Sequence, residues 1–182
     1  MVRAPEAADL VVNAVPTQHV RDVFAALRPA LAPAPLLSLS KGIEVATGML
    51  PTRILAEVLG SERPVAVLTG PCIAQEVARG LPTAVVVAGD RAAWFQEIFT
   101  TDRFRVYTSD DAAGAELAAA LKNVMGIAAG IVDGLALGDN AKASLLTRGI
   151  AEIMRLGVAL GAQAKTFAGL AGFGDLFTTC VS

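Results

Sequence analysis

The chain has 182 residues, enough for one substantial domain or two small ones, and a formal net charge of −2. Apolar residues make up 54% and charged residues 18%, so a sizeable core can form, while the small net charge provides no field for nucleic acid or an acidic membrane. Cys72, Cys180 and His19 form no metal-ligand spacing, so no metal site is expected. This cysteine usage fits a reducing, cytoplasmic compartment.

The high mean hydropathy, +0.56, raises the question of a membrane. Every uncharged run ends well short of the roughly 18 apolar residues that a spanning helix needs. The N-terminal stretch places Arg3, Glu6 and Asp9 before any apolar run, which is unlike a signal peptide. We therefore expect a soluble protein.

Residues 10–108 alternate short apolar runs with helical patterns. Thr17 and Asp90 are expected to cap two of the helices. The alternation is typical of βαβ units and predicts a mostly parallel sheet. Strands are expected at 10–15, 36–39, 65–68, 83–87 and 104–108, and helices at 17–27, at 50–59, from the TGPC turn to residue 78, and up to residue 99.

The pattern changes after Ser109, and only helices are expected from there on, at about 112–135, 140–160 and near Thr166. This shift predicts a boundary near Asp110, between an α/β part at 1–110 and an all-helical part at 111–182. Neither GxGxxG nor GxxxxGK[ST], the glycine-rich loops that hold phosphates in such sheets, occurs in the sequence.

Lysine is scarce, and it is the leading candidate for a general acid because the one histidine, His19, is expected at the surface of the first helix. Trp94, Tyr107 and the phenylalanines are expected in the core. The four lysines are Lys41, Lys122, Lys142 and Lys165.

Lys122 interrupts the apolar helix GAELAAALKNVMGIAAGIVDG. Its neighbours three and four positions away are small or apolar and include no carboxylate: Ala118, Ala119, Met125 and Gly126. Either the ammonium reaches solvent from a helix edge, which the pattern alone favours, or it is desolvated in a cleft. Desolvation would lower the pKa of Lys122 toward a range that is useful for acid–base chemistry.

Three other stretches carry candidate residues. Lys41, in SLSKGIE, follows a strand, where residues of parallel sheets line a ligand crevice. LTGPC places Gly70 and Cys72 at a strand end that opens a helix, although an ordinary turn explains it equally well. Asp175, in AGFGDLFTTC, is by default a helix cap and alternatively the hydrogen-bond partner of a catalytic lysine.

Together these stretches resemble the NAD(P)-dependent glycerol-3-phosphate dehydrogenases of the bacterial type, over nearly the whole chain. The resemblance implies an incomplete Rossmann-like parallel sheet, in a partial dinucleotide-binding domain at 1–110, followed by a partial helical domain at 111–182. It also implies reduction of dihydroxyacetone phosphate to sn-glycerol 3-phosphate with NADH or NADPH, for phospholipid synthesis. The matching stretches are ADLVVNAVPTQ, SKGIE, LTGPCIAQEVARGLPTAVVVA, FRVYTSDDAAGAELAAALKNVMGIAAGIVDGL, GDNAKASLLTRGIAEIMRLGVALGA and FAGLAGFGDLFTTC.

The resemblance also assigns roles to residues. Lys122 would be the catalytic lysine, protonating the ketone oxygen or stabilising its negative charge as hydride arrives. Lys41 would contact both cofactor and substrate, and Asp175 would help bind substrate and orient Lys122. The expected partners are a small-molecule substrate and a second copy in a homodimer, without nucleic acid or membrane. The remaining assignments are Gly70, Cys72, Asn123 and Thr179 in the substrate site and Ala74 in the cofactor site.

Three departures from the family pattern qualify this expectation. The family's glycine-rich loop would precede ADLVVNAVP and its Ser-Arg-Asn segment would follow TTCVS, so the chain is expected to be a fragment with an exposed sheet edge. The family's usual serine at position 72 is Cys72 here, and a thiol is a weaker hydrogen-bond donor.

Three functions therefore stay open: an active dehydrogenase, a non-catalytic remnant that pairs with another chain through its helical half, and a related hydroxyacid dehydrogenase. The LKN and GFGDLFTTC blocks favour glycerol phosphate as the substrate over a hydroxyacid.

Overall fold

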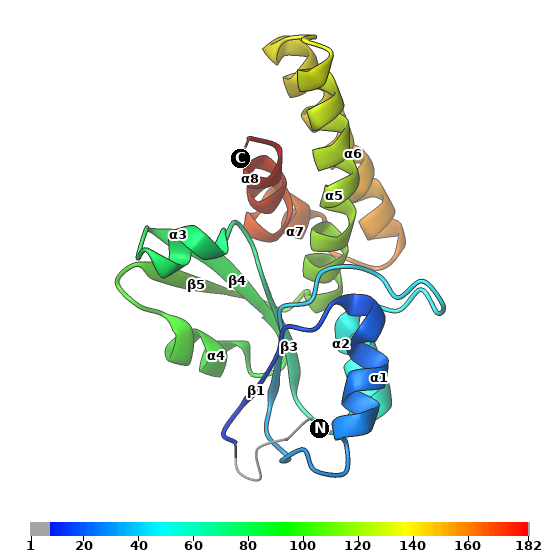
Figure 1. Cartoon of the computed structure of the whole chain (residues 1–182), viewed down its shortest axis with the longest axis vertical. Coiled ribbons are helices and arrows are strands. Elements are labelled where there is room, and N and C mark those ends of the chain that lie inside the picture. The colour runs from blue at the N-terminus through cyan, green and yellow to red at the C-terminus, as the bar shows by residue number, and fades with distance from the viewer. Residues whose placement is uncertain (1–7, 182) are drawn as a thin grey trace.

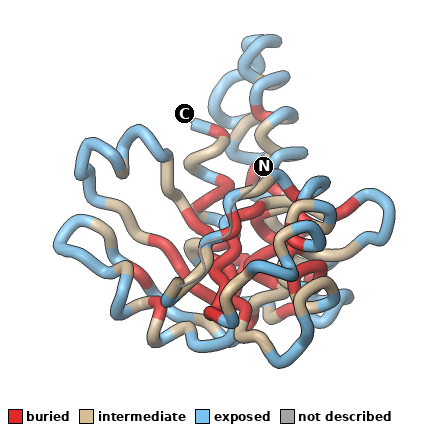
Figure 2. The backbone as a smooth tube through the Cα atoms, turned by 60° about the horizontal axis from the view of Figure 1, so that its bottom comes forward, coloured by how far each residue is buried: buried red, intermediate tan, exposed pale blue. Residues whose placement is uncertain are grey.

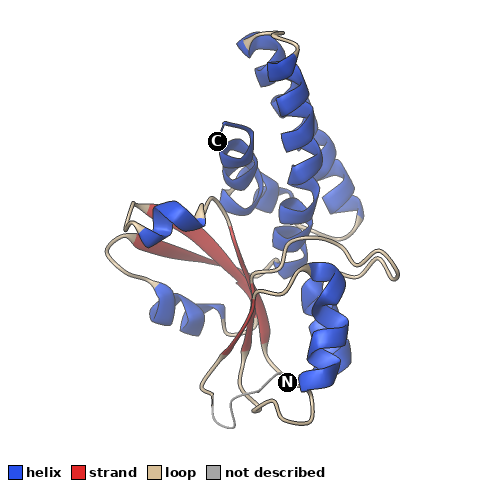
Figure 3. Cartoon of the chain, viewed as in Figure 1, coloured by secondary structure: helices blue, strands red, loops and turns tan. Residues whose placement is uncertain are grey.

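A computed structural model describes residues 8–181, which form a five-stranded sheet with helices on both faces, followed by helices alone (Figures 1 and 3). The first part contains β1 (Val11–Asn13), α1 (Thr17–Leu27), β2 (Leu36–Ser38), α2 (Pro51–Leu59), β3 (Val65–Thr69), α3 (Ala74–Ala78), β4 (Thr83–Gly89), α4 (Ala92–Phe99) and β5 (Phe104–Ser109). The second contains α5 (Ala112–Gly134), α6 (Asp139–Ala159), α7 (Ala164–Ala168), the π-helical turn η1 (Leu170–Gly174) and α8 (Asp175–Val181). The predicted strands and helices are confirmed, with ends that differ by one or two residues.

The strands lie in the order β1-β2-β3-β4-β5. The pairs β1–β2, β2–β3 and β4–β5 are parallel, whereas β3 and β4 are antiparallel. The predicted mostly parallel sheet is confirmed, and β3–β4 is its antiparallel pair. The link between them holds only the five-residue helix α3.

Alternating side chains of the strands bury both faces of the sheet. One face packs under Phe95 of α4 and is formed by Leu37, Ala66, Leu68, Val85, Val87 and Val106. The other face meets α1 and α2 through Leu36 and Val65, and meets α5 and η1 through Val67, Val86 and Ala88. Burial is greatest where the sheet meets the bases of these helices, while the far ends of α5 and α6 are exposed (Figure 2).

Helix α5 joins the two parts. By length and composition it could cross a membrane, but a core helix meets the same criterion, so one such helix is weak evidence. Its first half is buried against β3, β4 and α6, and this half includes the ionisable side chains Glu116 and Lys122. Packing therefore explains the apolar composition of this first half, whereas Val124, Ile127 and Ile131 in the second half are exposed.

Two of the predicted caps are wrong. Thr17 is the first residue of α1, no side chain caps that helix, and the Thr17 hydroxyl is buried without a hydrogen-bond partner. Helix α4 follows Arg91 in a left-handed conformation, and Oδ2 of Asp90 instead accepts from the backbone N–H of Val65 at 3.2 Å. Asp90 therefore ties the end of β4 to the start of β3.

The aromatic residues divide between core and surface. Trp94 packs at the margin of the α4 core, and His19 is exposed, as predicted. The core assignment is wrong for Tyr107, which lies on the edge strand β5 and is 49% exposed. It is also wrong for Phe173 and Phe177, which stack beside each other on the outer side of η1 and α8. Val12, on the opposite edge strand β1, is 44% exposed.

Candidate active site

The candidate residues meet where the first three strands end. Because β1, β2 and β3 are parallel, their carboxyl ends lie at the same edge of the sheet. Lys41 follows β2, Gly70 follows β3, and α5 and α8 bring Lys122 and Asp175 to the same place. Residues from both parts of the chain therefore form one cluster.

A single carboxylate holds two ammonium groups. Lys122 Nζ donates to Oδ1 of Asp175 at 2.6 Å, and Lys41 Nζ donates to Oδ2 at 2.7 Å. The hydroxyl of Thr69, the last residue of β3, lies 3.5 Å from Oδ2. Asp175 is 3% exposed, so its charge is desolvated and depends on these donors. Asp175 begins α8, and its carboxylate binds lysines rather than acting as a simple cap.

Lys122 is buried, which decides between the two alternatives for its position. It is 9% exposed, and its Nζ also donates to Oγ1 of Thr179 at 2.8 Å. Desolvation is the main cause that lowers the pKa of Lys122. The hydrogen bond that Lys122 donates to Asp175 opposes that shift, and the charge of Lys41 adds to it. An ammonium with a lowered pKa gives up its proton more readily.

Glycines allow the helices that carry these groups to approach closely. A Cβ on Gly126 of α5 would lie 3.0 Å from Cγ2 of Thr179, so this glycine lets α8 pack beside Lys122. A Cβ on Gly172 of η1 would lie 2.1 Å from the carbonyl oxygen of Phe167. The turn that presents Asp175 therefore requires glycine at position 172.

The TGPC turn borders the same cluster. Gly70 has a φ of +130°, and a Cβ there would lie 3.2 Å from Cα of Val85, so only glycine fits. Burial raises the pKa of the half-buried Cys72 thiol. The charges of Lys41 and Lys122 lower this pKa, and the charge of Asp175 raises it. The thiol is thus kept protonated within reach of the charges of the site.

Two predicted residues lie at the margin of the cluster. Ala74 is the exposed first residue of α3, just after the TGPC turn. Asn123 is exposed on α5, about 100° around the helix from Lys122, and has no hydrogen bond within the cluster that the structure describes. Thr179, by contrast, contacts Lys122 directly.

Three buried polar groups near these elements were not predicted. At the ends of β1 and β2, Asn13 donates to the hydroxyls of Ser38 and Ser40 at 3.1 and 2.9 Å. On α5, Glu116 accepts from the backbone N–H and the hydroxyl of Thr52, at the start of α2, at 2.9 and 2.5 Å. The available signal was the interruption of an apolar run by a polar residue, in LVVNAV and in GAELAAA.

Asp111 is the third of these groups. Its carboxylate caps α5 through the N–H of Gly114 at 2.9 Å. It also accepts from the hydroxyl of Thr166 at 2.6 Å and the N–H of Gln163 at 2.9 Å, which fixes α7 against the start of α5. Among residues 8–181, no group of three or more His, Cys, Asp or Glu is arranged to hold a metal ion.

The geometry is that of two-part dehydrogenases, in which a mainly parallel nucleotide-binding sheet meets a helical part at the carboxyl ends of its strands. The chain belongs to the NAD-dependent glycerol-3-phosphate dehydrogenase family. Residues 1–94 match the family's N-terminal model and residues 111–182 match its C-terminal model.

Known relatives agree with this assignment. A glycerol-3-phosphate dehydrogenase [NAD(P)+] of Thermotoga sp. is 52% identical over 174 residues, which cover 96% of this chain and 53% of the relative. The Syntrophomonas wolfei enzyme of that name is 47% identical over 188 residues, covering 100% and 55%. The crystal structure of glycerol-3-phosphate dehydrogenase from Coxiella burnetii is 40% identical, with a TM-score of 0.88, and covers 95% of this chain and 53% of that one. The chain thus spans about half the length of the relatives it matches.

Proposed function

We propose that this chain carries the catalytic centre of an NAD(P)-dependent dehydrogenase that reduces dihydroxyacetone phosphate to sn-glycerol 3-phosphate. The observation that carries the proposal is the placement of Lys122. Its ammonium is desolvated, has a lowered pKa, and is oriented by Asp175 and Thr179 beside the carboxyl ends of the parallel strands. A general acid for a ketone oxygen needs these properties.

The end of β1 offers a place that fits part of a dinucleotide. Helix α1 starts there without a side-chain cap and without an acidic residue in its first turn, and the buried Thr17 hydroxyl has no partner. The positive end of a helix dipole suits an anionic group such as a cofactor phosphate. Lys41 and Ala74 are the residues of this chain that we assign to the cofactor, which supplies the hydride when bound.

In this proposal Lys122 holds a proton at Nζ and donates it to the ketone oxygen as negative charge develops there. The side chain of Asp175 orients Nζ, while Lys41 binds the substrate and cofactor. Gly70 and Cys72 line the substrate site, with Thr179 and Asn123 beside them. Residues 1–110 then form the cofactor part and residues 111–182 the substrate part.

The test is the oxidation of NADH and NADPH with dihydroxyacetone phosphate by the 182-residue chain and by Lys122→Ala. We expect the wild-type chain to oxidise the cofactor and Lys122→Ala to lose this activity. A folded wild-type chain without turnover would overturn the proposal for this chain and favour a non-catalytic remnant. Oxidation of NADH or NADPH with keto acids alone would favour a hydroxyacid dehydrogenase.

The proposal also includes a cytoplasmic homodimer. Apolar side chains exposed along α5 would be covered by a second copy: Val124, Ile127, Ile131 and Leu135. Light scattering on the purified chain tests this, and a monomer at all concentrations would contradict it.

A further inference from the structure

Lys41 reaches the candidate site from a segment without regular structure. Residues 39–50, here called the Lys41 loop, connect β2 to α2 and stand out beside α1 (Figure 1). Residues 45–48 of the loop are open to solvent, and Val45 is 87% exposed. Such a loop would be mobile unless other elements held it, yet Lys41 Nζ lies 2.7 Å from Asp175.

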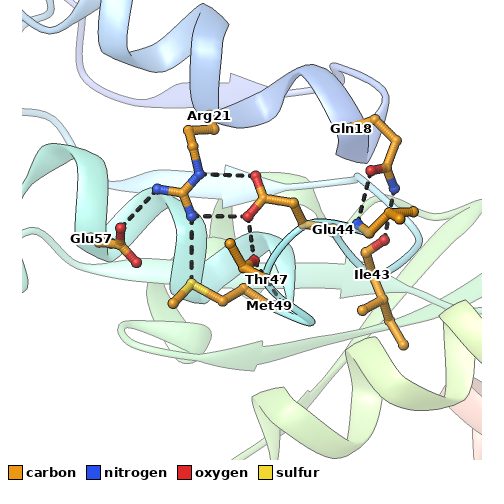
Figure 4. A network of polar contacts seen from close by, with 8 residues as sticks. Gln18, Arg21, Ile43, Glu44, Thr47, Met49 and Glu57 are labelled. Carbon is orange, nitrogen blue, oxygen red and sulfur yellow. Dashed lines mark hydrogen bonds and ion pairs between the residues drawn. The ribbon is translucent and has the colours of Figure 1, made fainter.

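Gln18 of α1 holds the backbone of the loop just after the lysine. Its amide nitrogen donates to the carbonyl oxygen of Ile43 at 2.7 Å, and its amide oxygen accepts from the N–H of Val45 at 3.0 Å (Figure 4). Both ends of one side chain therefore bind the backbone on either side of Glu44. Gly42 also lies tightly against α1, because a Cβ there would be 3.1 Å from Oγ1 of Thr17.

Arg21, one turn along the same face of α1, binds the side chain between those two backbone contacts. Its Nε and Nη2 donate to Oε1 and Oε2 of Glu44, both at 2.9 Å, in a bidentate pair (Figure 4). Its Nη1 donates to Glu57 of α2 at 2.8 Å. Figure 4 shows the guanidinium between the loop and α2, so one side chain joins three elements.

Glu44 is buried within this network. It is 6% exposed, and the hydroxyl of Thr47 also donates to its carboxylate. The hydrogen bonds from Arg21, and secondly from Thr47, hold the pKa of Glu44 below its ordinary value. The backbone closes the loop around Glu44, whose N–H donates to Met49 and whose carbonyl accepts from Gly48, at 2.9 and 2.8 Å.

We propose that Gln18, Arg21 and Glu44 are positioning residues that hold the ammonium of Lys41 against Asp175. They touch neither the reacting groups nor Lys122; they fix the chain two to four residues beyond Lys41. The part of Lys41 in substrate binding rests on the proposed function, whereas the position of its ammonium does not.

Competitive lysine acylation tests the position directly, because the chain has only four lysines and mass spectrometry can separate them. Acetic anhydride is applied to the full chain and to Arg21→Met, Glu44→Gln and Gln18→Ala. Lys165, which is 73% exposed in its side chain, serves as the internal reference. Arg28→Met is the matched control, since Arg28 lies at the exposed end of the same helix.

We expect the acylation rate of Lys41 relative to Lys165 to rise about fivefold in Arg21→Met and less in Gln18→Ala, because a partly exposed charged contact is lost. The rate of Lys122 should not rise with it, because displacing the Lys41 charge removes one of the causes that lower the pKa of Lys122. Arg28→Met should match the wild type. An unchanged Lys41 rate in chains whose circular dichroism is native would overturn the proposal. If Arg21→Met does not fold, Glu44→Gln and Gln18→Ala decide in the same way.

If the chain catalyses the reaction, enzyme kinetics provide a second readout. Arg21→Met should raise the KM for dihydroxyacetone phosphate and move the pH profile of kcat toward higher pH, because the Lys41 charge that helps lower the pKa of Lys122 is displaced. In the Lys41→Met background the Arg21 substitution should have no further effect on KM, whereas a merely structural role would lower activity in both backgrounds. A chain without turnover would contradict the proposed function and leave the acylation result valid.

Discussion

Nζ of Lys122 lies 2.6 Å from Oδ1 of Asp175, although the two residues are 53 positions apart. The first residue of α8 thereby meets the middle of α5, and Lys41 adds a third charge from the sheet. Two ammonium groups and one carboxylate leave a net positive charge where Lys122 and Asp175 are buried and Lys41 is partly exposed. Such an arrangement suits an anionic substrate and a group that must release a proton.

The first prediction concerns the carboxylate that the two lysines share. Asp175→Asn removes the group that opposes the desolvation of Lys122, so the pKa of Lys122 should fall further below its ordinary value. The free energy of unfolding should fall by about 2–4 kcal/mol because two partly desolvated cations lose their counter-ion. NMR titration of ε-¹³C-lysine and urea unfolding measure the two effects.

Asp133→Asn is the matched control for this prediction. Asp133 pairs with Lys142 at 2.7 Å on the surface, with 57% of its side chain exposed. Its loss should cost less than about 1 kcal/mol and leave the titration of Lys122 unchanged. Equal destabilisation by the two substitutions would show that the Asp175 cluster is no more than a surface ion pair.

A second prediction separates two glycines of α5. Gly130→Ala should stabilise the chain by about 0.5–1 kcal/mol, because a Cβ there meets no atom within 4 Å and alanine favours the helix. Gly126→Ala should not raise the free energy of unfolding in this way, because the new Cβ would lie 3.0 Å from Cγ2 of Thr179. Thr179 cannot turn away cheaply, as its hydroxyl donates to the carbonyl of Asp175 and accepts from Lys122.

Urea unfolding of the two alanine variants compares them under the same conditions. The acylation rate of Lys122 should rise in Gly126→Ala alone, because displaced α8 no longer covers the ammonium. If both variants were stabilised equally, α8 would not be packed on Gly126 as closely as the structure shows.

The sequence predicted the elements of this fold well because each carries a local signal. The apolar runs around Leu36 and Val65 become buried strands, and the amphipathic run from Thr17 becomes α1. The sequence did not specify which strand pair is antiparallel, because alternating strands and helices look the same for a parallel and an antiparallel partner. The two cap predictions were wrong for a related reason. Asp90 and Thr17 occupy sequence positions suitable for helix caps, but tertiary contacts determine the environment of their side chains.

The site was less accessible to local reasoning. The helical pattern around Lys122 left its burial open. Asp175 was only an alternative partner for a catalytic lysine, and the resemblance to a family identified that lysine as Lys122. No spacing rule links Glu116 to Thr52, 64 positions away, or Arg21 to Glu44 across two elements. These contacts depend on where the tertiary fold places α2 and the Lys41 loop. A short stretch of sequence carries no information about that placement.

The third prediction uses Cys72 as a probe of the charges around it. The charge of Lys41 lowers the pKa of the Cys72 thiol and that of Asp175 raises it. Since thiolate is the reactive form, Lys41→Met should slow the alkylation of Cys72 at pH 8, and Asp175→Asn should accelerate it. Iodoacetamide labelling with peptide mapping separates Cys72 from the buried Cys180.

Lys165→Met is the control for the lysine substitution, since Lys165 is exposed and belongs to a different surface. It should leave the rate at Cys72 unaltered. Changes of the same sign in Lys41→Met and Asp175→Asn would point to altered exposure rather than charge, and would remove Cys72 from the cluster.

The last prediction concerns the dependence of stability on pH. Burial raises the pKa of the Glu116 carboxyl from 4.5 to about 7, against the opposing effects of its hydrogen bonds from Thr52 and the charge of Arg53. The unfolded chain then ionises this group at lower pH than the folded chain does. The protonated Glu116 side chain stabilises the folded chain fully below about pH 4.5. This stabilisation is lost as the pH rises through 7, which lowers the free energy of unfolding by about 3 kcal/mol in total.

Glu116→Gln removes this ionisation and keeps the shape of the side chain. Its amide oxygen can still accept from the N–H of Thr52, and its amide nitrogen can donate to the Thr52 hydroxyl. Urea unfolding of both proteins between pH 5 and 8 should give a difference in the free energy of unfolding that grows with pH in favour of the variant. If the difference in the free energy of unfolding does not change with pH, Glu116 ionises normally in the folded chain. The contact between α5 and α2 would then be open to water.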